Sequence, residues 1–155
     1  MKQLLQLITF SSQVPIQPLH RGMNARVNSV LEVERKVLMF INAIAQEAGD
    51  SEFSSENSDL LEQICFQSLT SQEMFDEIVC FVIKETNGNP SEESQRLAFH
   101  LLFVLLSQRR PSSHLLHYIV YYIYLQLSQS GAIGGLAVSI MRVLLSDDLR
   151  FVDGT

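Results

Sequence analysis

The chain has 155 residues, of which 46% are hydrophobic and 18% charged, and its formal net charge is −6. A chain of this length and apolar content is expected to form one domain around a single core. The acidic balance argues against nucleic-acid binding, because neutralising phosphates requires a basic surface. Two cysteines make neither a disulfide framework nor a four-ligand zinc site, so a reducing, cytoplasmic compartment is expected.

Neither of two apolar segments predicts insertion into a membrane. The N-terminal residues Met1–Phe10 alternate polar and apolar side chains too often for a signal sequence. The apolar run Leu115–Leu127 is shorter than the roughly 20 residues that a helix needs to span a bilayer.

The first half of the chain predicts three helices. Apolar residues recur with a period close to 3.6 in Val30–Ala48 and again in Asp59–Gln67. Thr70 and Glu73 then form a capping-box pattern, in which the Thr70 hydroxyl accepts from an unpaired helical N–H and Glu73 reaches back. We expect the helix that they open to end near Thr86.

The second half of the chain predicts three more helices. Asn89 is a candidate cap for a helix with Pro90 at its first position, ending near Leu106. Two further helices are predicted over His114–Ser128 and, after a glycine-rich interruption, over Leu136–Leu145.

The fold class that follows is all-α, a bundle of about five to seven helices joined by short turns. Leu97–Leu106 and Leu115–Leu127 are apolar on nearly every side, which is typical of helices at the centre of a bundle. We expect these two to pack as an antiparallel pair because the turn between them is short. Six of their side chains should be nearly inaccessible: Leu101, Phe103, Leu105, Ile119, Val120 and Ile123.

The helical domain is expected to occupy residues 1–148, followed by a short tail over residues 149–155. The tail alternates polar and apolar residues and ends in Asp153-Gly154, which is a hairpin signal without a second strand to complete it.

Cys80, His100 and Asp76 could supply a nucleophile, a base and an orienting carboxylate. Spacing alone cannot show that they meet, and a cysteine on an apolar helical face usually acts as a small hydrophobe. The chain also lacks a glycine-rich phosphate loop. We therefore expect no enzymatic activity and no cofactor.

His114, His117, Tyr121 and Tyr124 recur along one predicted helix at intervals of three, four and three. The two histidines could share a metal ion, but no further ligand is close in sequence, so no metal site is expected. The stripe is either a semi-polar seam in the core or a ridge for a partner, and we favour the seam.

Two groups of charged residues carry specific predictions. Glu77 and Arg96 lie in apolar helical segments, where an isolated charge would be costly, so we expect them to form an ion pair. Arg109 and Arg110 make a basic turn before the histidines of the stripe. Arg109, Arg110, His114 and His117 are therefore the candidate partner-binding residues, with an inert helix junction as the alternative.

Several separated segments resemble the myosin tail homology 4 (MyTH4) domain, in the same order as in that family. Phe75–Cys80 resembles its Arg-Asp-Glu-Ile-Tyr-Cys helix, Lys84–Thr86 its Lys-Gln-Thr run and Asn89-Pro90 its Asn-Pro turn. Pro15–Leu19 resembles the Pro-Ile-x-x-Pro-Leu entry, and Arg96 stands at the start of the family's long apolar helix. The family residues are replaced at Phe75, Val79, Phe81, Leu97 and Ala98.

The resemblance implies a helical, non-catalytic interaction module of a cytoskeletal motor tail or adapter. It implies a protein partner or cargo peptide, or an adjacent FERM domain in a longer chain, and a cytoplasmic, cytoskeleton-associated location. The alternative that it raises is binding to microtubules. Since the microtubule surface is acidic, the net charge of −6 weakens that alternative.

Overall fold

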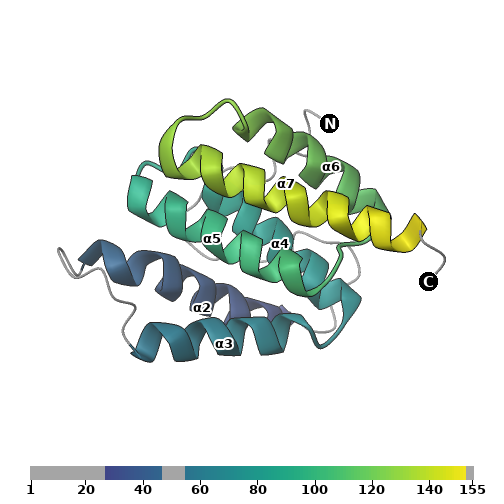
Figure 1. The fold of residues 1–155 in the computed structure, drawn as a ribbon. Helices are drawn as coiled ribbons and strands as arrows, with labels where there is room; N and C mark the ends of the chain where they lie inside the picture. Colours follow the sequence, from purple (N-terminus) through teal and green to yellow (C-terminus); the bar gives the residue numbers. More distant parts are fainter. Residues whose placement is uncertain (1–26, 47–54, 153–155) are drawn as a thin grey trace.

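The structure, a computed structural model, describes residues 27–46 and 55–152. These residues form six helices and no strand, in three layers of two helices each (Figure 1). One outer layer holds α2 and α3, the middle layer α4 and α5, and the other outer layer α6 and α7. The helices are α2 (Val27–Gln46), α3 (Ser55–Ser68), α4 (Gln72–Thr86), α5 (Glu92–Gln108), α6 (Ser113–Gln126) and α7 (Gly131–Val152).

The predicted all-α bundle is confirmed, and each predicted helix has a counterpart in the structure. The largest difference is at the C-terminal end, where α7 begins five residues before the predicted Leu136 and continues to Val152. Residues 149–152 of the predicted tail are therefore helical, not part of a hairpin. The proposed domain limit at residue 148 stays a prediction.

Two helices begin at a different cap from the predicted one. The Ser71 hydroxyl accepts a hydrogen bond from the Met74 N–H at 3.1 Å, whereas the Thr70 hydroxyl donates to the Gln67 carbonyl at 2.9 Å. Likewise Ser91 caps α5, and the Asn89 side chain accepts from the Ser91 N–H at 2.9 Å. In both cases a neighbouring residue closes the preceding turn and leaves the cap to a serine.

Gly131 and Gly134 start α7 instead of interrupting it. Gly131 has a φ of 74°, a left-handed conformation that glycine adopts without strain. A Cβ atom at Gly134 would lie 2.1 Å from the backbone oxygen of Gln129. The preceding turn therefore approaches the helix closely, which only a residue without a side chain permits.

The middle layer carries the core. α5 packs against α4, α7 and α2, and every α4 side chain from Met74 to Thr86 is buried. The prediction that α5 and α6 form a direct antiparallel pair is wrong, because α7 packs against both and they touch each other only slightly. Their described ring contact joins Phe99 and Tyr122, whose centroids are 6.5 Å apart.

Four of the six side chains expected to be inaccessible are fully buried: Leu101, Leu105, Ile119 and Ile123. Phe103 on α5 and Val120 on α6 are only half-buried. For Val120 the reason is that α6 is an outer helix with an exposed side. Of the helices described, none is both long enough and apolar enough to cross a membrane.

Candidate partner-binding surface

The predicted contact residues lie where α5 ends and α6 begins. Arg109 is the C-cap of α5 in an extended conformation, and its N–H donates to the Leu105 carbonyl at 3.3 Å. Pro111 follows and is buried, and α6 begins after Ser112. The extended Arg109 and the proline turn the chain from the middle layer into the outer one (Figure 1).

The Arg109 side chain is bound to another part of the chain. Its Nε donates to Gln72 Oε1 at 3.1 Å, and its Nη1 donates to the Leu69 carbonyl at 3.2 Å. The Gln72 Nε2 in turn donates to the Arg110 carbonyl at 3.1 Å. Arg109 and Gln72 thus join the α3–α4 turn to the α5–α6 turn, so Arg109 is a structural residue as well as a candidate contact.

Asp76 completes this network from inside α4. It is 1% exposed, and its Oδ1 accepts from the Ser112 N–H at 3.0 Å and from Gln72 Nε2 at 3.0 Å. The Ser112 hydroxyl donates to the other carboxylate oxygen. The Ser112 side chain makes no capping hydrogen bond to α6. Instead, the Asp76 carboxylate from α4 accepts a backbone N–H at the start of α6.

The predicted stripe on α6 is a ridge on the surface, which corrects the preference for a core seam. His114 and His117 are exposed, and Tyr121 and Tyr124 are 42% and 64% exposed. The buried tyrosine of α6 is Tyr122, whose hydroxyl is 2.7 Å from the Thr86 hydroxyl. The stripe faces outward because α6 lies in the outer layer and buries only its opposite side.

The structure brings Arg109, Arg110, His114 and His117 to one end of α6. The two arginines are half-buried, and the two histidines are exposed. Within the described part of the chain no group of three or more metal-ligating side chains occurs, the two histidines included. The accessible chemistry of this surface is therefore rings with polar edges beside a basic turn, which suits contact with a protein.

The candidate triad of Cys80, His100 and Asp76 has the wrong electrostatics for a nucleophile. Burial, followed by the carboxylates of Glu77 and Asp76, raises the pKa of the Cys80 thiol to about 12. The thiol therefore stays protonated at neutral pH, whereas a nucleophile must be a thiolate. Burial and the nearby Arg96 lower the pKa of His100, and Asp76 is engaged with Ser112 and Gln72.

Glu77 and Arg96 occupy different environments. Glu77 is fully buried and lies close enough to Glu34 of α2 to raise the pKa of that residue. Arg96 has a side chain that is 40% exposed and pairs with Glu93 at 3.1 Å on its own helix. The Glu77–Arg96 pair stays a prediction.

Sequence reasoning missed Gln72 and Phe66. Gln72 looks like an ordinary first-turn residue, and only the tertiary structure brings it to the α5–α6 turn. Phe66 is 77% exposed on α3. The available signal was periodicity, because Phe66 falls outside the apolar stripe made by Leu60, Leu61, Ile64 and Cys65.

Comparison with known proteins agrees with the fold and the motifs. The MyTH4 domain family matches residues 61–147, which is more than half of the chain. Among curated proteins no sequence matches.

Three solved structures of Dictyostelium discoideum myosin VII share the fold. The MyTH4-FERM MF1 domain, mutant 2, is 18% identical with a TM-score of 0.78, over 92% of this chain and 29% of that one. The MF2 domain is 20% identical with a TM-score of 0.75, over 90% and 27%. Its mutant 1 is 21% identical with a TM-score of 0.74, over 90% and 28%.

This chain thus spans less than a third of the length of those MyTH4-FERM chains. The family match extends from α3 to α7 and includes both turns that Arg109 and Gln72 join. The protein belongs to the MyTH4 domain family.

Proposed function

We propose that the chain is a non-catalytic, partner-binding module of a cytoskeletal motor tail or adapter, located in the cytoplasm. Membership of the MyTH4 family supports the motor-tail context, and the MyTH4-FERM structures that it resembles support an adjacent FERM domain in a longer chain. The single observation that carries a binding role is the exposed ridge on α6, formed by His114, His117, Tyr121 and Tyr124.

The chemistry of the ridge indicates the partner. Aromatic rings that are already held on a helix offer contact area at a small entropic cost. Arg109 and Arg110 at the same end add positive charge, so the matching partner is a protein segment with carboxylates. We expect the carboxylates to lie toward the turn and apolar side chains toward Tyr121 and Tyr124.

Binding to microtubules is the weaker reading of the same surface. An acidic polymer requires cationic side chains that can reach it. Arg109 adds positive charge beside the ridge, but its side chain is held by Gln72 and Leu69, and that of Arg96 by Glu93, so neither extends to a polymer surface. Cosedimentation with microtubules over a salt series tests this alternative, because electrostatic binding weakens steeply as ionic strength rises.

The main test is an NMR titration of the 15N-labelled 155-residue chain with a synthetic peptide that alternates glutamate with leucine or phenylalanine. We expect amide shifts along α6 and the α5–α6 turn. The double variant His114→Glu, His117→Glu should weaken binding by about tenfold, equivalent to about 1.4 kcal/mol.

The matched control is Asn28→Glu, Ser29→Glu, two exposed positions at the start of α2, which changes the net charge equally. Arg109 is left intact because its substitution would disturb the turn that forms the surface. Equal loss of affinity in both double variants would show that the loss comes from the change in net charge. The α6 ridge would then not be the binding site.

A further inference from the structure

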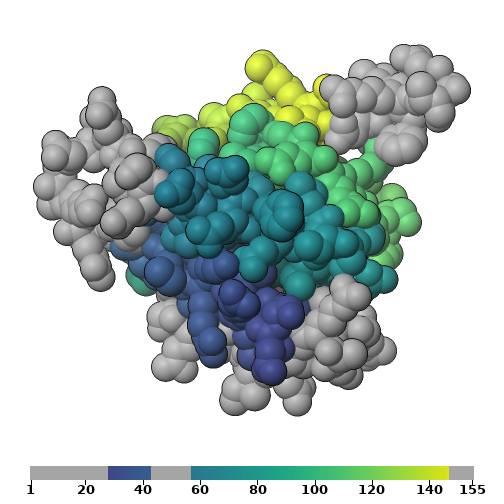
Figure 2. Space-filling model, turned by 90° about the horizontal axis from the view of Figure 1, so that it is seen from below, coloured from purple at the N-terminus to yellow at the C-terminus, as the bar shows by residue number. Residues whose placement is uncertain are grey.

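A second exposed face lies on α3, in the layer opposite to α6 (Figure 1). Asp59, Glu62 and Phe66 follow one another at intervals of three and four residues, so they share one side of the helix. All three are exposed, and Phe66 at 77% is the most exposed large apolar side chain among the described residues. Figure 2, which views the molecule from this side, shows α2 and α3 at the surface.

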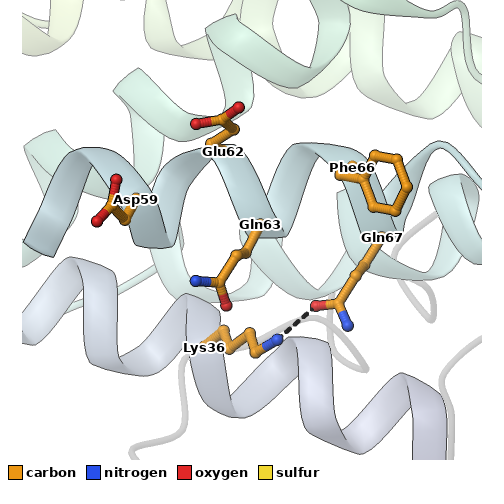
Figure 3. Close-up of a pocket in the computed structure, with 6 residues that line it drawn as sticks. All are labelled: Lys36, Asp59, Glu62, Gln63, Phe66 and Gln67. Carbon is orange, nitrogen blue, oxygen red and sulfur yellow. Dashed lines mark hydrogen bonds between the residues drawn. The ribbon is translucent and has the colours of Figure 1, made fainter.

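These side chains line a surface depression between α3 and α2 with a volume of about 630 Å³ (Figure 3). Gln63 and Gln67 extend from α3 toward Lys36 of α2, and Lys36 Nζ donates to Gln67 Oε1 at 2.8 Å. The part of the depression next to α2 is therefore polar and is fixed by the Lys36–Gln67 hydrogen bond. The phenyl ring of Phe66 lies at one end of the depression.

The charge of this face is negative. Lys36 is also 3.5 Å from Glu32, whose side chain is 60% exposed, so its charge is largely compensated on its own helix. Asp59 and Glu62 take part in no ion pair among the described residues. The four charged groups thus sum to about −2, beside an aromatic ring that is in contact with water.

We propose that the α2–α3 face, formed by Lys36, Asp59, Glu62, Gln63, Phe66 and Gln67, docks a basic amphipathic helix of another protein. Two basic side chains of that helix bind Asp59 and Glu62, and an apolar side chain covers Phe66. From the helical rise, the positions of Asp59 and Glu62 are about 4.5 Å apart along the α3 axis, and the position of Phe66 lies about 6 Å further along it. A partner helix with basic residues three positions apart and an apolar residue four positions later matches this spacing.

Charge decides against the other occupants. An acidic peptide would be repelled by Asp59 and Glu62. A second copy of this chain would bring the same carboxylates together across a two-fold axis, because such an interface pairs one patch with itself. An anionic membrane surface would be repelled for the same reason. Covering Phe66 also removes its apolar surface from water, which favours binding.

The test titrates the 15N-labelled full chain at low salt with a synthetic helical peptide that carries lysine and leucine at the stated spacing. The result expected is that amides of residues 59–67 and of Lys36 shift, and that affinity falls as salt is raised. Glu62→Lys should weaken binding at least tenfold, and Phe66→Ser about tenfold. The matched controls, Glu73→Lys and Leu145→Ser, replace an exposed glutamate on α4 and an exposed leucine on α7 and should change affinity less than twofold.

Absence of binding, or shifts that map to other helices, would overturn the proposal. It would also fail if Glu62→Lys and Glu73→Lys weakened binding equally, because the peptide would then respond to net charge alone. Every variant must show the same circular dichroism spectrum as the wild type, so that a loss of binding does not reflect a loss of fold. Since the probe is basic and the ridge test uses an acidic one, this proposal and the proposed function can fail independently.

Discussion

At the residue scale, a buried glutamate makes the stability of this fold depend on pH. Glu34 of α2 is fully buried, and neither carboxylate oxygen has a hydrogen-bond partner among the described residues. Burial, together with the nearby carboxylates of Glu77 and Glu85, raises the pKa of Glu34 to about 8, and Lys84 partly opposes this rise. A neutral carboxyl group is the form that such a site tolerates at neutral pH.

The sign of the effect follows from the two pKa values of Glu34, near 4.5 when unfolded and about 8 when folded. Between them the folded state holds a proton that the unfolded state has released, so the stability contributed by this group is lost as pH rises. We expect Glu34→Gln to remove this loss and to raise the free energy of unfolding at pH 8, by up to about 5 kcal/mol. Urea unfolding at pH 5 and pH 8 measures the change, and equal stability differences between variant and wild type at the two pH values would contradict it.

Tyr122 provides a second residue-scale test, with a control on the same helix. Its hydroxyl bonds to the Thr86 hydroxyl at 2.7 Å, and burial raises its pKa to about 12 despite that bond. Tyr122→Phe removes one buried hydrogen bond and leaves Thr86 without this partner, so it should cost about 1 kcal/mol. Tyr124→Phe, at a side chain that is 64% exposed, should cost close to nothing. Chemical denaturation of both variants distinguishes the two positions.

At the scale of elements, α5 is the helix on which the others depend. It packs against α2, α4 and α7, one helix from each layer. Leu105 is fully buried within it, whereas Leu145 on α7 is 53% exposed. Leu105→Ala should therefore destabilise the protein by about 2–5 kcal/mol through lost burial and a residual cavity. Leu145→Ala should change stability by less than about 0.5 kcal/mol, and equal effects of the two would contradict a central α5.

At the scale of the whole molecule, the three layers share one core. Buried side chains run continuously from Val30 in α2 to Leu144 in α7. A chain with one core is expected to unfold in a single cooperative step. Thermal unfolding followed by far-UV circular dichroism and by tyrosine fluorescence should give coincident midpoints. Separate midpoints would show that one layer melts on its own and that the chain is not a single folding unit.

The sequence by itself determined the helical class, the family resemblance and much of the core. Periodic apolar residues recur every three to four positions, and that spacing depends only on the geometry of the helix, so it can be read locally. The same argument correctly placed Leu101, Leu105, Ile119 and Ile123 in the interior. Cap positions were off by one or two residues, since Thr70 and Asn89 close turns next to the serines that cap the helices.

Only the tertiary structure decided which sides of the helices meet water and which turns meet each other. Because α6 lies in an outer layer, His117 and Tyr124 are exposed although their helix is apolar nearly all round. Arg109 reaches Gln72 across 37 positions of sequence, and Asp76 reaches Ser112 across 36. Such contacts depend on how helices cross in space, which side-chain spacing within one helix does not encode.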